Sequence, residues 1–237
     1  MKKKYTREEI HQLSSLYNRC EKYDLIIELA KCLIEDNPEL SQLEQSIFLQ
    51  GYKSKIYKER KSLIKLLEIE KKEKKRKSSH AHYIREIINP AIKSLLEVAD
   101  DFDKQIDILI PKAKTFDEMV YFYRLKCDFI RYKCQFLEKE KLKDEINKYE
   151  ITFGKGEKIA LQYLEKWSIR YLEFMLGKCV FMYEIMNQKK EPIELARKVI
   201  NPLKENENLD SETKKIFDLF KSNIIIWSGK CEADVII

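Results

Sequence analysis

The chain contains very few residues that break a helix. Its 237 residues include only 5 glycines and 5 prolines, and these are the two residue types that most disfavour a helix interior. Apolar residues recur every three or four positions along almost the whole chain, which is typical of amphipathic helices. Charged residues make up 36% and hydrophobic residues 44% of the chain, which suits solvated outer faces around an apolar core. These features predict an all-α fold.

Local signals divide the chain into about nine helices. Thr6 is expected to cap the first helix, and Ser41 with Glu44 forms the capping box of the third. We expect a stacked antiparallel array in a single domain over 1–228, followed by a short tail, 229–237. The expected helices are 5–20, 23–36, 41–75, 79–109 with a bend at Pro90, 115–138, a segment leading from 143–151 into 154–165, 166–187, 192–205, and 211–227 capped by Ser211.

Several functional classes find no support in the sequence. The six cysteines form no CxxC pair and lie far from the three histidines, so we expect buried apolar cysteines, no metal and no disulfide framework. No nucleophile–base arrangement and no glycine-rich phosphate loop is visible. The N-terminus lacks the apolar core of a signal peptide, and no apolar run approaches the ~20 residues of a membrane span. We therefore expect a non-enzymatic cytoplasmic protein, with the nucleus as a second location, and no cofactor.

The net charge of +6 is concentrated in one segment. Much of it lies in 70–77, EKKEKKRK. Such a charge run is usually the solvated end of a helix. A nucleic-acid or acidic-surface binder is the alternative, although nucleic acid is an unlikely partner because the charge is confined to this segment.

Two pairs of basic residues have a spacing that places both members on one helix face. Lys53 and Arg60 are seven residues apart, as are Arg124 and Arg131, and seven residues advance a helix by almost two turns. If the two helices are neighbours, the pairs converge on one anion. A phosphate monoester fits, because guanidinium groups bind two of its oxygens and an ammonium adds a point charge.

Two residues beside Arg131 extend this hypothesis. Tyr132 has a phenol hydroxyl that could donate a further bond to the anion, and Asp128, one turn earlier, could hold Arg131 in place. In a chain with 46 lysines and arginines, such spacings also arise by chance. On spacing alone, ordinary intrahelical ion pairs remain the alternative.

Five segments share an order and spacing with one known family. They are EKYDLIIELAKCLIE (21–35), ELSQLEQSIFLQGYKSKIYKERKS (39–62), YFYRLKCDFIRYKC (121–134), CVFMYEIMN (179–187) and LFKSNIIIWS (219–228). Together they resemble the 14-3-3 family of phosphopeptide-binding proteins over about residues 5–228. The resemblance implies nine antiparallel helices, dimerisation through the N-terminal helices, and an amphipathic groove for phosphoserine or phosphothreonine peptides.

The resemblance also implies roles for individual residues. The phosphate would be bound by Lys53, Arg60, Arg131 and Tyr132. The remaining groove positions are Arg124, Asp128, Leu176, Val180, Glu184, Leu219, Asn223, Ile226 and Trp227. The dimer interface corresponds to Leu16, Cys20, Lys22, Leu25, Ser62, Leu66, Tyr83 and Glu86. The implied partners are phosphorylated client proteins and a second 14-3-3-like chain, in a homodimer or heterodimer.

The chain departs from the family pattern at several of these places. Glu59 stands beside Arg60 where the family has a second arginine, Gly177 replaces an asparagine that holds the peptide backbone, and Lys215 falls in an apolar wall. Leu25 and Glu86 replace a charge pair across the dimer interface. The alternative function is therefore a degenerate 14-3-3-like scaffold, with weak or no phosphopeptide binding, that engages unphosphorylated partners.

Overall fold

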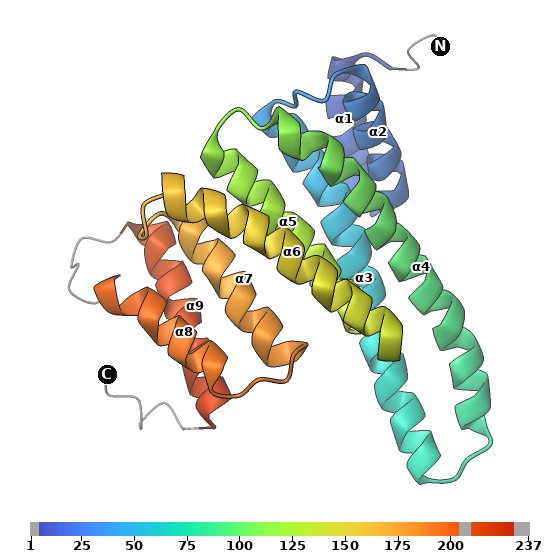
Figure 1. The fold of residues 1–237 in the computed structure, drawn as a ribbon. Helices are drawn as coiled ribbons and strands as arrows, with labels where there is room; N and C mark the ends of the chain where they lie inside the picture. Colours follow the sequence, from blue (N-terminus) through green and yellow to red (C-terminus); the bar gives the residue numbers. More distant parts are fainter. Residues whose placement is uncertain (1–4, 204–209, 230–237) are drawn as a thin grey trace. The chain divides into compact units, whose positions relative to one another are not determined.

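A computed structural model describes residues 5–203 and 210–229, which form nine α-helices and no strand (Figure 1). This confirms the all-α prediction. The helices are α1 (Arg7–Arg19), α2 (Tyr23–Asp36), α3 (Gln42–Lys75), α4 (His80–Leu109), α5 (Phe116–Cys134), α6 (Lys139–Tyr163), α7 (Ile169–Glu184), α8 (Glu191–Ile200) and α9 (Ser211–Ser228), with short 3-10 turns at Ile110–Lys112 and Asn201–Leu203. They group into two compact units, α1–α4 and α5–α9. The expectation of a single domain over 1–228 stays a prediction.

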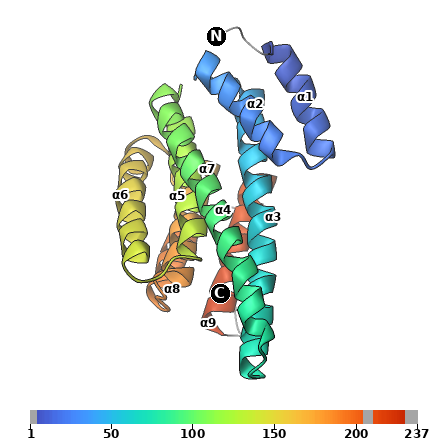
Figure 2. The ribbon, with the colours of Figure 1, turned by 90° about the vertical axis from the view of Figure 1, so that its right-hand side faces the viewer.

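The first unit is built on a long hairpin of α3 and α4, with the shorter α1–α2 hairpin packed against α3 (Figures 1 and 2). Its core contains the rings of Phe48, Tyr52 and Phe102, whose centroids lie 5.1–5.3 Å apart. The hydroxyl of Tyr52 donates to Asp101 at 2.7 Å, and Lys31 donates to the same carboxylate at 2.9 Å. The Tyr52 hydroxyl, the one polar atom of this buried aromatic cluster, therefore has a hydrogen-bond partner.

The predicted N-terminal caps of α1 and α3 are confirmed. Thr6 and Ser41 each accept a hydrogen bond from a backbone amide three residues on, and the carboxylates of Glu9 and Glu44 accept one from the backbone amides of the two caps. The cap of α9 is predicted wrongly. Asp210, one residue before Ser211, accepts from two backbone amides and so satisfies more of the free donors at the helix start.

Several helix boundaries also differ from the predictions, and α6 begins at Lys139 rather than near 143. α5 ends at Cys134 rather than near 138, because the chain turns there and the amide of Phe136 bonds to the Lys133 carbonyl at 2.9 Å. α7 begins at Ile169 rather than 166, since Ser168 is its cap, and it ends at Glu184 rather than 187. α8 ends at Ile200 rather than 205 and passes into the 3-10 turn Asn201–Leu203, in which Pro202 has no amide to donate to a further helical bond. Residues 204–205, predicted to end this helix, lie outside the described residues.

The second unit has an aromatic core between α6 and α7. Tyr149 stacks on Phe181 with centroids 3.4 Å apart, and Phe153 stacks on Phe174 at 4.4 Å. Three cysteines, Cys127, Cys134 and Cys179, are buried beside these rings, as expected. Burial raises the pKa of both Cys134 and Cys179 to about 12, so these thiols stay neutral. Cys20 is exposed and Cys32 half-buried.

The sixth helix is continuous, although the sequence predicts an interruption before 154. Its two glycines, Gly154 and Gly156, lie inside the helix in different surroundings. A Cβ at Gly156 would lie 2.7 Å from the Phe174 ring and 2.8 Å from Tyr123 Cβ, whereas a Cβ at Gly154 would meet nothing within 4 Å. Gly156 thus lets α6 approach its neighbours closely.

Some expectations concern absences or the chain end. Among the described residues, none of the helices is long and apolar enough to span a membrane, and no three His, Cys, Asp or Glu side chains cluster as metal ligands. α4 continues through Pro90. Apart from Gly229, which ends α9 at a φ of 65°, the predicted tail lies outside the described residues.

The two glycines of α6 generate a stability prediction. Gly156→Ala should lower the free energy of unfolding by ~1–3 kcal/mol through overpacking. Gly154→Ala is the matched control and should raise it by ~0.5–1 kcal/mol, because alanine favours a helix. Urea denaturation of both variants measures the difference. Equal effects of the two substitutions would contradict the packing role of Gly156.

Candidate functional site

Three charged side chains on one face of α5 form the centre of the candidate site. Asp128 Oδ2 lies 3.5 Å from Arg124 Nη1, and Asp128 Oδ1 lies 3.6 Å from Arg131 Nη2. All three side chains are largely buried, with exposed fractions of 15–17%. The spacing of one turn on either side lets one carboxylate hold both arginines. The predicted support of Arg131 by Asp128 is therefore present.

Arg131 is also bound by a residue from a different helix. Its Nη1 donates to Glu184 Oε2 of α7 at 2.9 Å, and Gln135 donates to the same oxygen at 3.3 Å. Burial lowers the pKa of Arg131, but the carboxylates of Asp128 and Glu184 raise it above its ordinary value. The guanidinium is thus a fixed cation, since two carboxylates stabilise its charge.

One donor of this arginine, its Nε, is shielded from solvent and has no hydrogen-bond partner among the described residues. The guanidinium carbon lies 4.9 Å from the centre of the Tyr132 ring, close enough for a cation–π interaction. Tyr132 itself is half-buried. Within the segment CDFIRYKC (127–134), Arg131 therefore provides a positioned cation beside the phenol of Tyr132.

The surroundings of Arg124 contain residues that the sequence reasoning missed. Its Nε lies 3.5 Å from Glu173, and its guanidinium lies 5.3 Å from the ring of Tyr121. Arg170 contacts the same two residues: its guanidinium lies 4.4 Å from the Tyr121 ring and 3.2 Å from Glu173. Tyr121 lies one turn before Arg124, so the helical spacing of α5 could have indicated it. Arg170 and Glu173 of α7 lie about fifty positions from Arg124, and no local sequence signal predicts that contact.

The predicted apolar side chains lie on α7 and α9 and reach solvent. Leu176 and Val180 are half-buried, while Leu219 and Ile226 are 53% and 67% exposed. These last two are seven residues apart on α9 and so share a face. They are surface residues rather than core, as a peptide-binding wall requires.

The polar residues of α9 lie on the same helix as this apolar pair. Asn223 is half-buried, and Trp227 stacks on Tyr183 of α7 with centroids 5.0 Å apart. Lys215 is exposed one turn before Leu219, so it is a surface cation at the start of the apolar stripe. In the described part of the second unit, the predicted α7 and α9 residues are therefore half-buried or exposed, whereas Arg124, Asp128 and Arg131 of α5 are largely buried.

The other two predicted phosphate ligands belong to the first unit. Lys53 and Arg60 are half-buried on α3, seven residues apart. Their convergence with Arg131 and Tyr132 stays a prediction. The neighbouring Glu59 is bound within its own unit: Lys55 lies 3.2 Å away and Ser94 donates to it at 3.0 Å.

Comparison with known proteins decides the family. The family model of the 14-3-3 protein matches residues 13–228. The chain belongs to the 14-3-3 family. Protein BMH2 of Saccharomyces cerevisiae is 29% identical over 94% of this chain and 85% of its own length. The 14-3-3 protein homolog of Trichoderma harzianum is 27% identical over 94% and 87%, and the checkpoint signal transducer rad25 of Schizosaccharomyces pombe 27% identical over 96% and 87%.

Membership of the 14-3-3 family supports an adaptor role in signalling, exercised through protein partners. It also gives meaning to the open space at Gly177. A Cβ at this position of α7 would meet nothing within 4 Å, so the glycine is not required for packing, unlike Gly156. Nothing in the structure explains why a glycine stands at this position.

The residues that match the 14-3-3 dimer interface are accessible in the single chain. Leu16 and Tyr83 are 55% and 62% exposed. Apart from the half-buried Leu66, the whole predicted set is exposed: Leu16, Cys20, Lys22, Leu25, Ser62, Tyr83 and Glu86. Dimerisation through these residues stays a prediction.

The basic segment 70–77 is the end of α3, with ion pairs of its own. Glu70 lies 2.9 Å from Lys74 and 2.7 Å from Arg85, and Glu73 lies 3.1 Å from Arg76. Part of the positive charge is thus balanced locally. This arrangement favours the ordinary interpretation, a solvated helix end, over a nucleic-acid surface.

Proposed function

We propose that this 14-3-3 protein is a non-enzymatic adaptor that binds phosphoserine or phosphothreonine peptides of client proteins. The observation that carries the proposal is the state of Arg131. It is held between Asp128 and Glu184 with a buried Nε that has no partner within the described chain. Arg131 and Tyr132 bind the phosphate, joined by Lys53 and Arg60 as the family resemblance implies.

A phosphate group matches this arrangement better than a carboxylate. At neutral pH a phosphoserine carries nearly two negative charges and three acceptor oxygens, and a guanidinium offers two parallel donors to them. Glu184 occupies Nη1 of Arg131 in the free protein. The doubly charged ligand competes with this singly charged and exposed carboxylate for the arginine.

The rest of the groove binds the peptide without reading phosphate. Asn223 offers an amide to the peptide backbone beside Trp227, and the exposed pair Leu219 and Ile226 covers apolar peptide side chains. Because these contacts are shared by phosphorylated and unphosphorylated peptides, they add affinity but no phosphate dependence.

We also propose that the protein acts in the cytoplasm, with the nucleus as a second location, and pairs into a homodimer or heterodimer. Family membership supports both points, and the exposed Leu16 and Tyr83 provide apolar contact area. Leu25 and Glu86 alter the interface. The relative named as a checkpoint signal transducer supports a place in signalling.

A second candidate function is a scaffold for unphosphorylated partners. Gly177 favours it, because it removes a side chain that family members use to hold the peptide backbone, at ~1 kcal/mol per lost hydrogen bond. Lys215 favours it too, since it places a charge at the apolar stripe.

Arg131→Ala tests the proposed function. Titration of a phosphoserine peptide should show affinity at least ~30-fold weaker than for the natural chain, because charge-assisted hydrogen bonds contribute ~1.5–3 kcal/mol each. The unphosphorylated peptide should bind weakly to both proteins. Isothermal titration calorimetry measures all four combinations.

Arg197→Ala is the matched control, because Arg197 is an exposed arginine on α8 of the same unit. It should leave both affinities unchanged. Binding of the natural chain that ignores the phosphate and Arg131 would support the scaffold and contradict the adaptor.

Gly177→Asn is expected to strengthen phosphopeptide binding about fivefold. The open space at this position accepts the side chain, and one restored hydrogen bond contributes ~1 kcal/mol. Gly154→Asn, at the other open helical glycine, should stabilise its helix similarly but leave the affinity unchanged. If both variants bind like the natural chain, position 177 does not contact the peptide.

A further inference from the structure

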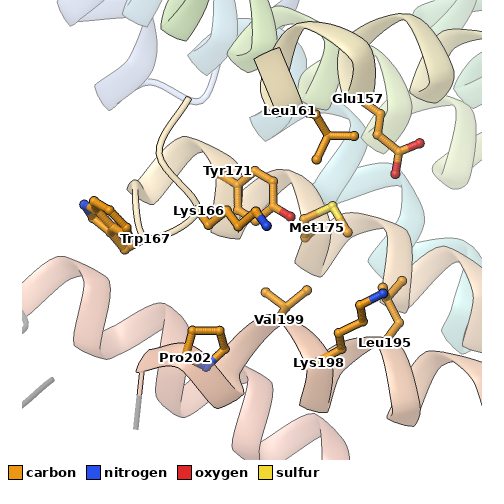
Figure 3. Close-up of a pocket in the computed structure, with 10 residues that line it drawn as sticks. All are labelled: Glu157, Leu161, Lys166, Trp167, Tyr171, Met175, Leu195, Lys198, Val199 and Pro202. Atoms are coloured by element: carbon orange, nitrogen blue, oxygen red, sulfur yellow. The ribbon is translucent and has the colours of Figure 1, made fainter. Parts of the chain in front are cut away.

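The second unit contains a pocket that is separate from the predicted peptide groove. It is bounded by α6, α7, α8 and the 164–168 connection (Figure 3), and its lining includes no predicted groove residue. The cavity volume is about 500 Å³. This is within the range of roughly 300–1,000 Å³ that is typical of small-molecule sites.

The pocket has an apolar floor and an aromatic rim. Met175 and Val199 are buried at its base, from α7 and α8. Leu161 and Trp167 lie at its edge and are 59% and 58% exposed. A tryptophan so exposed leaves much apolar area in water, and that area is available for an aromatic or aliphatic ligand.

The charge of the pocket is positive. Lys166 and Lys198 are exposed, and neither has an ion-pair partner in the described ranges. Figure 3 shows the Lys166 side chain extending across the pocket toward Tyr171, while Lys198 projects from α8. The one lining carboxylate, Glu157, is paired with Lys178 at 3.0 Å. Two ammonium groups thus remain without a counter-charge at an apolar cavity.

A neutral hydrogen-bond donor, Tyr171, also lines the pocket beside Lys166 (Figure 3). Burial, reinforced by the Glu157 carboxylate, raises the pKa of Tyr171. Its hydroxyl therefore stays protonated at neutral pH and can donate to an anion.

We propose that this pocket binds a small amphiphilic anion, an organic carboxylate or sulfonate with an aromatic or branched apolar body. The apolar body lies on Met175 and Trp167, and the anionic group is bound by Lys166 and Lys198. Charge complementarity selects this class. A neutral ligand gains nothing from the two ammonium groups, and a small inorganic anion leaves the apolar floor in water.

The test uses 8-anilino-1-naphthalenesulfonate, which combines an aromatic apolar body with an anionic sulfonate. The chain has only two tryptophans, Trp167 and Trp227, so in a Trp227→Phe background all tryptophan emission comes from Trp167 at the edge of the pocket. Phenylalanine preserves a ring against Tyr183. Saturable quenching of Trp167, with energy transfer to the dye, is the expected result.

A double variant of the two pocket lysines tests the role of their positive charge. Lys166→Gln with Lys198→Gln should weaken dye binding about tenfold, because each exposed ion pair contributes up to about fivefold. Lys141→Gln with Lys143→Gln removes the same charge from exposed positions of α6 outside the pocket, and it should leave binding unchanged. Leu161→Glu, at an exposed edge position, should also weaken binding by repulsion.

Comparison with a neutral dye completes the test. N-phenyl-1-naphthylamine has the same rings without the sulfonate, and its binding should not change in the lysine variant. The proposal is wrong if the sulfonate leaves Trp167 emission unchanged. It is also wrong if the two lysine pairs, inside and outside the pocket, have equal effects.

Discussion

The carboxylate of Asp128 is the interaction on which the candidate site depends. It contacts one arginine a turn before it and another a turn after it, both largely buried. Desolvating such charges is costly, so a buried ion pair is weak support for stability. The ion pairs instead fix the position of the Arg131 side chain. α5 presents Arg131 as a fixed cation, and Glu184 of α7 joins that cation to the neighbouring helix.

Features set by neighbouring residues could be predicted from the sequence, and features set by packing could not. Thr6 and Ser41 each need only a partner three residues on, so these caps were recognisable. The close approach of α6 to α7 depends on Gly156 fitting against Phe174 of another helix. The Arg131–Glu184 pair joins residues 53 positions apart. The family resemblance predicted Glu184 as a groove residue, but it did not predict that Glu184 binds Arg131.

The departures from the family pattern differ in physical weight. Glu59 is paired with Lys55, which Asp24 shares, and accepts a hydrogen bond from Ser94, so its charge beside Arg60 is partly balanced. Gly177 leaves open space where family members have an amide. In the proposed groove, the charged residues of α5 are therefore present, and position 177 offers no side chain to the peptide backbone.

The central claim is that cations of α3 and α5 bind the same phosphate. A double-mutant cycle of Arg60→Ala and Arg131→Ala, read as phosphoserine-peptide affinity, tests it most directly. Each single variant should lose most of the phosphate dependence, and the double variant should lose little more, with a coupling energy of ~1 kcal/mol or above. Losses that add within ~0.5 kcal/mol would mean that the two arginines act independently, and would contradict the account.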